Sequence, residues 1–201
     1  MNIFLSISIL AFVFLTNVYS LSNLWFIRHC DKIDDENPCC SNEGYLRAEN
    51  WENYFSKMPI NLSYIYAANY DLGKNEICEK KERYKPNKNC NKSQRMILTA
   101  DAIYNKMDTI EKYNIDYCVG DYKDLIDNSE TKENKDILIV WEHNEIVDMI
   151  NYVGIELAKW PDDIDVYNIV FMIDMETEKL YYDCYNYETN ELGCIDSVED
   201  W

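Results

Sequence analysis

The chain has 201 residues and a formal net charge of −18, with 19 Lys and Arg against 37 Asp and Glu. Nucleic acid and anionic membrane surfaces repel so acidic a protein, so neither is an expected partner. Hydrophobic residues make up 47% of the chain, which is enough for the core of one ordinary domain.

The N-terminal segment predicts secretion. Residues 1–20 contain no charged residue, and residues 3–18 are almost wholly apolar. That run is short for a membrane span, which needs about 20 apolar residues. Val18 and Ser20 are acceptable at positions −3 and −1 of a cleavage site, so we expect a signal peptide over residues 1–20 and a single secreted domain over residues 21–201. An uncleaved anchor is the alternative, since no Lys or Arg precedes the apolar run.

The first predicted element of the mature domain is a strand over residues 24–27, whose four apolar residues indicate burial on both faces. Arg28 and His29 follow it directly. A charged residue and an imidazole at the end of a buried strand are costly there unless something uses them. This point of the chain is therefore a candidate functional site.

Apolar spacing and capping residues predict the next elements. In order they are a helix from the cap Ser41 to Pro59, a strand at residues 64–68, a helix capped by Ser93 with apolar residues through Met107, and a strand at residues 115–119 ending at Gly120-Asp121. Arg95 falls in the first turn of the second helix, where a cation opposes the helix dipole unless an anion is bound. This placement favours a phosphate site, and a surface Arg that reaches a carboxylate is the alternative.

The last third of the chain begins with a second strongly apolar run. The expected elements are a buried strand at residues 137–141 ending at Glu142-His143, a helix through Leu157 stopped by Pro161, strands at residues 166–173 and 180–185 joined by a tight turn at residues 174–179, and a loose acidic tail from Glu188. Strands that alternate with helices indicate an α/β domain, a three-layer sandwich on a mostly parallel sheet.

Eight cysteines indicate disulfides formed in an oxidising compartment. Because eight can pair in 105 ways, the connectivity stays open. The nearest local pairs are Cys78 with Cys90 and Cys184 with Cys194. The neighbours Cys39 and Cys40 are expected to belong to two different disulfides.

Two glycosylation sequons begin at Asn61 and Asn91 and fit the secretory route. Asn91 lies only four residues before Arg95, so a glycan there is expected to be absent or turned outward. Residues 74–95 contain eight basic and three acidic residues. This segment is either a solvated Lys-rich loop or a positive rim that gathers an anionic substrate.

The chain has two histidines, and both follow buried strands. Ligands of such sheets bind where the strands end, so we expect Arg28, His29 and His143 to converge there together with Arg95. Arginine forks match the paired oxygens of phosphate. An imidazole between two guanidiniums resists protonation, which keeps its nitrogen free to attack phosphorus. The set suits phosphoryl transfer through a phosphohistidine that water then hydrolyses.

Four segments, in order along the chain, resemble motifs of the histidine phosphatase (phosphoglycerate-mutase-like) superfamily. Residues 24–29 resemble its Arg-His signature, residues 41–48 its "T/S-x-x-G-x-x-x-A" helix start, residues 93–100 its "S-x-x-x-R-A-x-x-T-A" segment with a shortened lead-in, and Glu142-His143 its second histidine. The resemblance implies that His29 is the phosphate-accepting nucleophile and that Arg28, Arg95 and His143 complete the phosphate pocket. It implies no cofactor and no metal.

The sequence departs from the family pattern beside both histidines. Cys30 and Asn144 stand where the family has Gly. The proton donor to the leaving group is not obvious, and Asp121 is the most family-like position, with Glu145 as the competitor. Loss of such an acid costs roughly 10²–10⁴ in rate.

Two functions remain open from the sequence. One is a secreted phosphatase acting on a phosphomonoester, such as a phosphorylated small molecule. The other is a catalytically degenerate relative of the same fold that serves as a secreted binding or structural domain.

Two further kinds of site are conceivable from these residues. A zinc site could draw on His29, Cys30, Asp31, Glu142 and His143, but structural zinc sites prefer spaced Cys and His pairs. A cysteine hydrolase could use Cys30 with His143, but a disulfide is the more natural state of Cys30 in an oxidising compartment.

Overall fold

The computed structural model describes residues 23–34, 36–71, 78, 90, 93–129, 135–160 and 167–192. The predicted signal peptide, most of the basic segment with Asn91, and the tail from residue 193 lie outside these ranges, so the predictions for them stay predictions. Within the described ranges, no helix combines the length and the apolar character that a membrane crossing requires.

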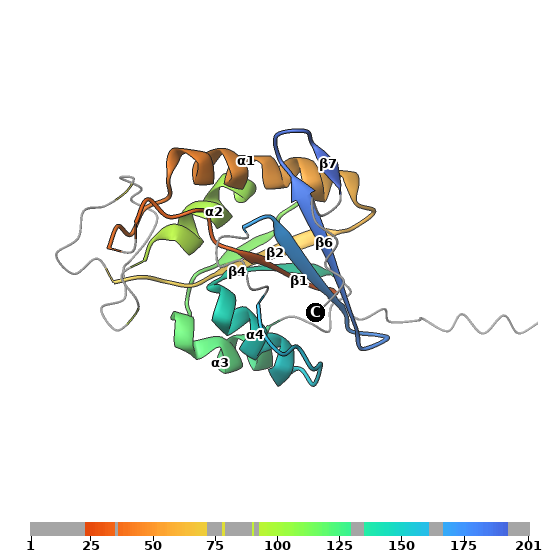
Figure 1. The fold of residues 1–201 in the computed structure, drawn as a ribbon. Helices are drawn as coiled ribbons and strands as arrows, with labels where there is room; N and C mark the ends of the chain where they lie inside the picture. Colours follow the sequence, from red (N-terminus) through yellow and green to blue (C-terminus); the bar gives the residue numbers. More distant parts are fainter. Residues whose placement is uncertain are drawn as a thin grey trace, which may run out of the picture.

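A seven-stranded sheet forms the centre of the domain, in the order β3-β2-β4-β1-β5-β6-β7 (Figure 1). The strands are β1 (Asn23–Arg28), β2 (Leu62–Ala67), β3 (Lys112–Asn114), β4 (Asp136–Trp141), β5 (Ile169–Asp174), β6 (Lys179–Asn186) and β7 (Glu191–Leu192). The first four strands of the order pair in parallel, and β5, β6 and β7 extend the sheet antiparallel. The α/β prediction is confirmed, with a sheet that is mixed rather than mostly parallel.

Helices cover both faces of the sheet (Figure 1). Helices α1 (Asn42–Lys57) and α2 (Arg95–Tyr104) lie on one side, and α3 (Tyr122–Asn128) and α4 (His143–Tyr152) lie on the other. This is the predicted three-layer sandwich. Because helices pack on both faces, the central strands β1, β2 and β4 must be apolar on both sides, which explains their unbroken hydrophobic runs.

The predicted start of α1 is correct, whereas both ends of α2 differ from the prediction. Ser41 caps α1, and its Oγ accepts a hydrogen bond from the Gly44 amide at 3.0 Å. Ser93 does not cap α2, because its Oγ instead accepts a hydrogen bond from Nε of Arg95. The N-cap of α2 is Gln94, and the helix ends at Tyr104, before Met107.

The predicted strand at residues 115–119 is wrong. Strand β3 lies earlier, at Lys112–Asn114, because these are the residues that pair with β2. The Asn114 side chain then accepts a hydrogen bond from the Asp116 amide, which turns the chain out of the sheet. Residues Val119–Asp121 form a 3-10 turn, η1, so Asp121 does not stand at the end of a strand.

The C-terminal elements differ from the prediction at the end of helix α4, at the start of β5 and in the tail. Helix α4 ends at Tyr152, well before Leu157, and Gly154 follows with a φ of +94° that favours glycine. The strand–turn–strand pair is confirmed as β5 and β6, but β5 begins at Ile169, so Tyr167 precedes the strand instead of belonging to it. The tail is not wholly loose, because β7 pairs with the end of β6.

Three disulfides have both ends among the described residues: Cys30–Cys40, Cys39–Cys78 and Cys90–Cys118. The local pair Cys78–Cys90 is therefore wrong, because each end of the basic segment is bonded to the body of the domain instead. The assignment of Cys39 and Cys40 to separate disulfides is confirmed. Cys184 is disulfide-bonded, and residue 194, its predicted partner, lies outside the described ranges.

The close approach of α1 to the loop after β1 yields a first prediction. A Cβ on Gly44 would stand 2.7 Å from the backbone nitrogen and oxygen of Asp31. We expect Gly44→Ala to destabilise the protein by about 1–3 kcal/mol, because backbone on both sides must move. Thermal or urea unfolding measures this change. Gly120→Ala is the matched control, since its Cβ meets nothing within 4 Å, and an equal loss in both variants would contradict the prediction.

Candidate active site

The ends of β1 and β4 lie side by side and define the site. The two strands pair in parallel with Arg28 opposite Trp141, and the His29 amide donates a hydrogen bond to the Trp141 carbonyl at 3.1 Å. Neighbouring strands are about 4.8 Å apart, so the residues that leave each strand start from adjacent points. His29 and the pair Glu142-His143 therefore leave the sheet at neighbouring strand ends.

His29 is buried and is held in one protonation form. Only 4% of the residue is exposed, and its Nδ1 lies 2.8 Å from the carbonyl oxygen of Cys30. A carbonyl accepts only from N–H, so Nδ1 carries the proton and Nε2 keeps its lone pair. Burial, followed by the charges of Arg95 and Arg28, lowers the pKa of His29 to about 3, against opposing effects of the Cys30 carbonyl and Glu142. The ring is therefore neutral at physiological pH, with the lone pair of Nε2 available.

The Arg28 side chain packs against Tyr167, a residue that the sequence did not mark as part of the site. The Arg28 guanidinium lies 4.0 Å from the centre of the Tyr167 ring and donates a hydrogen bond to its hydroxyl at 3.3 Å. The ring centres of Tyr167 and His29 are 6.0 Å apart. Tyr167 lies in a segment predicted as part of a strand, outside every motif, so no local signal marked it.

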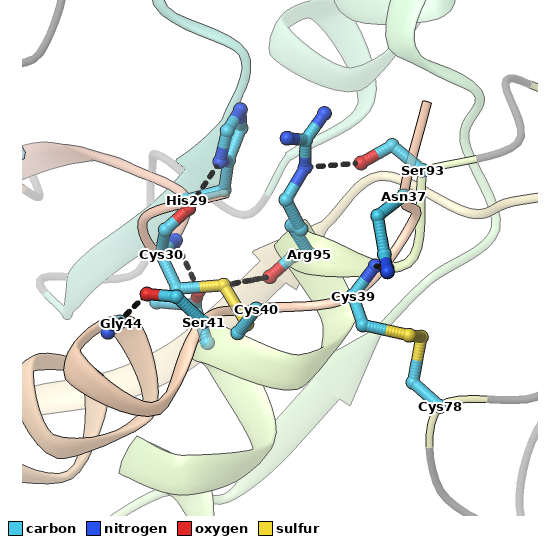
Figure 2. The surroundings of a disulfide bond; sticks show 11 residues. His29, Cys30, Asn37, Cys39, Cys40, Ser41, Gly44, Cys78, Ser93 and Arg95 are labelled. Carbon is cyan, nitrogen blue, oxygen red and sulfur yellow. Dashed lines mark hydrogen bonds between the residues drawn. A yellow bond between two sulfur atoms is a disulfide. The ribbon is translucent and has the colours of Figure 1, made fainter. Parts of the chain in front are cut away.

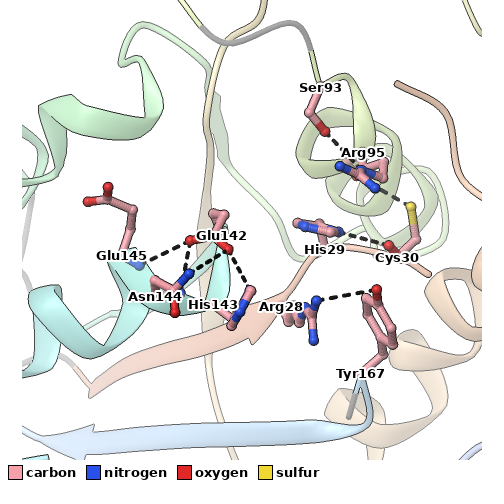
Figure 3. A network of polar contacts seen from close by, with 10 residues as sticks. All are labelled: Arg28, His29, Cys30, Ser93, Arg95, Glu142, His143, Asn144, Glu145 and Tyr167. Atoms are coloured by element: carbon pink, nitrogen blue, oxygen red, sulfur yellow. Dashed lines mark hydrogen bonds and ion pairs between the residues drawn. The ribbon is translucent and has the colours of Figure 1, made fainter. Parts of the chain in front are cut away.

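Arg95 approaches His29 from the first turn of α2 (Figure 3). Its Nε donates to Ser93 Oγ at 3.0 Å, which orients the guanidinium. After burial, its charge is the next cause that lowers the pKa of the His29 ring. The prediction that Arg28, His29 and Arg95 converge agrees with these contacts.

His143 is the first residue of α4, and Glu142 caps that helix. Oε1 of Glu142 lies 2.5 Å from Nδ1 of His143, and Oε2 accepts hydrogen bonds from the amides of Asn144 at 2.9 Å and Glu145 at 3.3 Å. Burial acts to raise the pKa of Glu142, but the contacts with His143 and the two amides outweigh it and leave that pKa lowered. Glu142 thus holds the second histidine as a carboxylate, a role that the sequence analysis did not assign.

The two candidate proton donors, Asp121 and Glu145, stand in different surroundings. Asp121 is exposed in η1, where its Oδ2 accepts a hydrogen bond from the Cys118 amide at 3.0 Å. Burial, together with Asp148 and Glu142, raises the pKa of Glu145. Its carboxylate points away from His29 (Figure 3).

Two alternatives fail on the chemistry of Cys30. Its sulfur is bonded to Cys40 (Figure 2), so Cys30 offers neither a thiolate ligand for zinc nor a nucleophile for a cysteine hydrolase. Across the part of the chain that the structure describes, no group of three or more His, Cys, Asp and Glu side chains is arranged to hold a metal ion.

Comparison with known proteins identifies the fold. No protein-family model matches the chain, and no curated protein matches it significantly. The protein histidine phosphatase SixA, solved in complex with tungstate, superposes with a TM-score of 0.53 at 8% identity, covering 80% of this chain and 93% of its own. The putative phosphohistidine phosphatase SixA from Agrobacterium tumefaciens gives 0.48 at 13% identity, with 80% and 95% covered. Phosphoglycerate mutase from Plasmodium falciparum gives 0.46 at 13% identity, with 90% and 99% covered.

The chain therefore has the histidine phosphatase (phosphoglycerate-mutase-like) fold. The similarity at 8% identity concerns the arrangement of the elements, and the roles of the individual side chains are argued from their own contacts.

The buried neutral imidazole predicts a specific pH dependence of stability. With a folded pKa of about 3 and an ordinary value of 6.5, His29 takes up a proton more readily in the unfolded chain. Its contribution is intact above pH 6.5 and is lost as the pH falls toward 3, by about 2 kcal/mol at pH 5. Urea unfolding of wild type and His29→Gln between pH 7.5 and 4.5 should give a shallower slope for the variant. Parallel curves would contradict the prediction.

Proposed function

We propose that this protein is a secreted phosphatase that hydrolyses a phosphomonoester through a phosphohistidine intermediate on His29. The observation that carries the proposal is a buried, neutral imidazole whose Nε2 is not the protonated nitrogen, influenced by the charges of Arg28 and Arg95. An uncharged nitrogen nucleophile among cations is suited to attack on a dianionic phosphoryl group.

Several charged side chains of the site bind the oxygens of the phosphoryl group. The guanidiniums of Arg28 and Arg95 bind its oxygens and stabilise the charge that spreads over them during transfer. With Nδ1 of His143 directed at the Glu142 carboxylate, Nε2 donates a further hydrogen bond to an equatorial oxygen when the ring is an imidazolium. Because Tyr167 and Ser93 already orient the two arginines, little reorganisation is needed when the substrate binds.

The reaction then proceeds in two displacements. Nε2 of His29 forms a bond to phosphorus as the ester P–O bond breaks, and the leaving oxygen takes a proton from a general acid. Water next attacks the phosphohistidine, giving inorganic phosphate and restoring the neutral ring, while the acid recovers its proton from that water.

We propose Asp121 as the general acid. The indole of Trp141, the last residue of β4, donates to the Val119 carbonyl at 2.9 Å, which fixes η1 against the end of that strand. Asp121 thus lies on a segment attached to the same edge of the sheet as His143, and its exposed position suits contact with a leaving group that faces solvent.

The fold neighbour and the disulfides support the substrate class and the compartment. The protein histidine phosphatase SixA was solved with tungstate, a tetrahedral oxyanion like phosphate. The substrate proposed here is a phosphorylated small molecule or another phosphate ester. Disulfides persist in oxidising compartments, which supports an extracellular protein.

A binding domain without turnover is the second candidate. It is favoured by one observation: Asp121 is exposed with its Oδ2 bound by the Cys118 amide, and the Glu145 carboxylate points away from His29 (Figure 3). Such a protein would still bind an oxyanion at the two arginines, since that binding needs no acid.

Activity toward p-nitrophenyl phosphate tests the proposed function. Wild type should release phosphate, and His29→Ala should lose at least about 1000-fold of the rate because the nucleophile is gone. A radiolabelled phosphoenzyme that is labile in acid and stable in base should form with wild type only. Tyr181→Ala, an exposed position of β6, is the control that keeps activity. Vanadate binding without turnover would instead support the binding domain.

The choice of leaving group tests Asp121. Asp121→Asn should lose roughly 10²–10⁴ in rate on an alkyl phosphate, whose leaving oxygen needs a proton, and much less on p-nitrophenyl phosphate. Glu145→Gln should keep the wild-type rate on both esters. Selective loss in the Glu145 variant, or equal losses on both esters in the Asp121 variant, would show the assignment of the acid to be wrong.

A further inference from the structure

Cys30, the residue after His29, is held at three points. Its carbonyl oxygen lies 2.8 Å from Nδ1 of His29, and its amide donates a hydrogen bond to Oγ1 of Thr99 at 2.7 Å. Its sulfur is bonded to Cys40 (Figure 2). Thr99 is fully buried, and Cys30 and Cys40 are 3% exposed, so water does not compete for these contacts. Cys30, which contacts the His29 ring, is thus fixed through its carbonyl oxygen, its amide and its sulfur.

Thr99 connects this peptide to the helix that carries Arg95. Its hydroxyl accepts from the Cys30 amide and donates to the Arg95 carbonyl at 2.8 Å. The sulfur of Cys30 lies 3.7 Å from the same carbonyl oxygen. One hydroxyl therefore sets the distance between the loop of His29 and the first turn of α2.

The disulfide connects the same peptide to α1. Cys40 directly precedes the cap residue Ser41, whose amide donates to the Asp31 carbonyl at 2.8 Å. The loop after β1 is therefore bound covalently and by hydrogen bonds to the start of α1, and through Thr99 to the start of α2. These two attachments leave the Cys30 carbonyl little freedom to rotate.

We propose that the Thr99 hydroxyl and the Cys30–Cys40 disulfide form a clamp that positions the nucleophile: by fixing the Cys30 carbonyl, the clamp keeps the proton of His29 on Nδ1 and leaves Nε2 free for phosphorus. The inference rests on the proposed function for its effect on rate. Thr99 and Cys30 act through His29 and are positioning residues. A histidine in the other tautomer presents N–H where a lone pair is needed, which costs a large part of the rate.

A pair of substitutions at Thr99 tests the clamp. Thr99→Val keeps the shape and removes the hydroxyl, so kcat on p-nitrophenyl phosphate should fall about 10- to 100-fold with KM changed less than about threefold. Thr99→Ser keeps the hydroxyl and should stay within about threefold of wild type. Nitrogen-15 NMR of the imidazoles, simplified by the two histidines of the chain, should report Nδ1–H for His29 in wild type and Thr99→Ser, and a mixture of tautomers in Thr99→Val.

Removal of a disulfide supplies a second test with a matched control. The double variant Cys30→Ala, Cys40→Ala should reduce kcat and mix the His29 tautomers. The double variant Cys39→Ala, Cys78→Ala removes a disulfide from the adjacent residue of the same segment without touching Cys30, and should leave both readouts near wild type. This pair decides the question if Thr99→Val does not fold.

The outcomes separate the clamp from the proposed function. Wild-type kcat and an unchanged His29 tautomer in a folded Thr99→Val would overturn the clamp, as would equal losses in the two disulfide variants. A wild type that releases no phosphate would overturn the proposed function, and the tautomer measurements would still confirm or overturn the clamp.

Discussion

The parallel pairing of β1 with β4 is the constraint on which the site depends. With Arg28 opposite Trp141, the chain delivers Arg28 and His29 from one strand beside Glu142 and His143 from the next. A slip by one residue would turn each apolar side chain of β1 to the opposite face and move Arg28 out of place. Both strands are closely packed by side chains of different shape, such as Trp25 and Ile27, so a slip would not fit the core, and the hydrogen bond from the His29 amide to the Trp141 carbonyl holds the register at the strand ends. The same burial that stabilises the fold therefore aligns the polar groups.

Charged groups whose burial costs free energy surround one neutral imidazole. Two guanidiniums act on a buried imidazole, and the Glu142 carboxylate is partly buried at the start of α4. Each charged group has its own support, Tyr167 for Arg28, Ser93 for Arg95 and His143 for Glu142. Such supporting contacts keep a site preorganised, and perturbed groups of this kind gather at functional sites more often than elsewhere.

The disulfides gather near this same edge of the sheet. Cys30–Cys40 fixes the residue after His29, and the other two described disulfides bind residues 78 and 90, near the ends of the basic segment, to the body of the domain. The histidine phosphatase pattern has Gly after the first histidine, and here Cys30 replaces its backbone freedom with a covalent attachment. These covalent cross-links join segments that are 10 to 39 residues apart and limit the movement of the loops that they connect.

The sequence by itself determined the buried strands, the capped helix α1 and the α/β class, and it named Arg28, His29, Arg95 and His143 as candidate site residues, because apolar runs, caps and motif order are local signals. It could not determine β3, whose position depends on pairing with β2, or the role of Tyr167, which depends on the path of a distant segment past Arg28. The disulfide partners also needed three dimensions, since Cys78 lies near Cys90 in sequence but is bonded to Cys39. Contacts between residues far apart in the chain decided these features, and no local pattern encodes them.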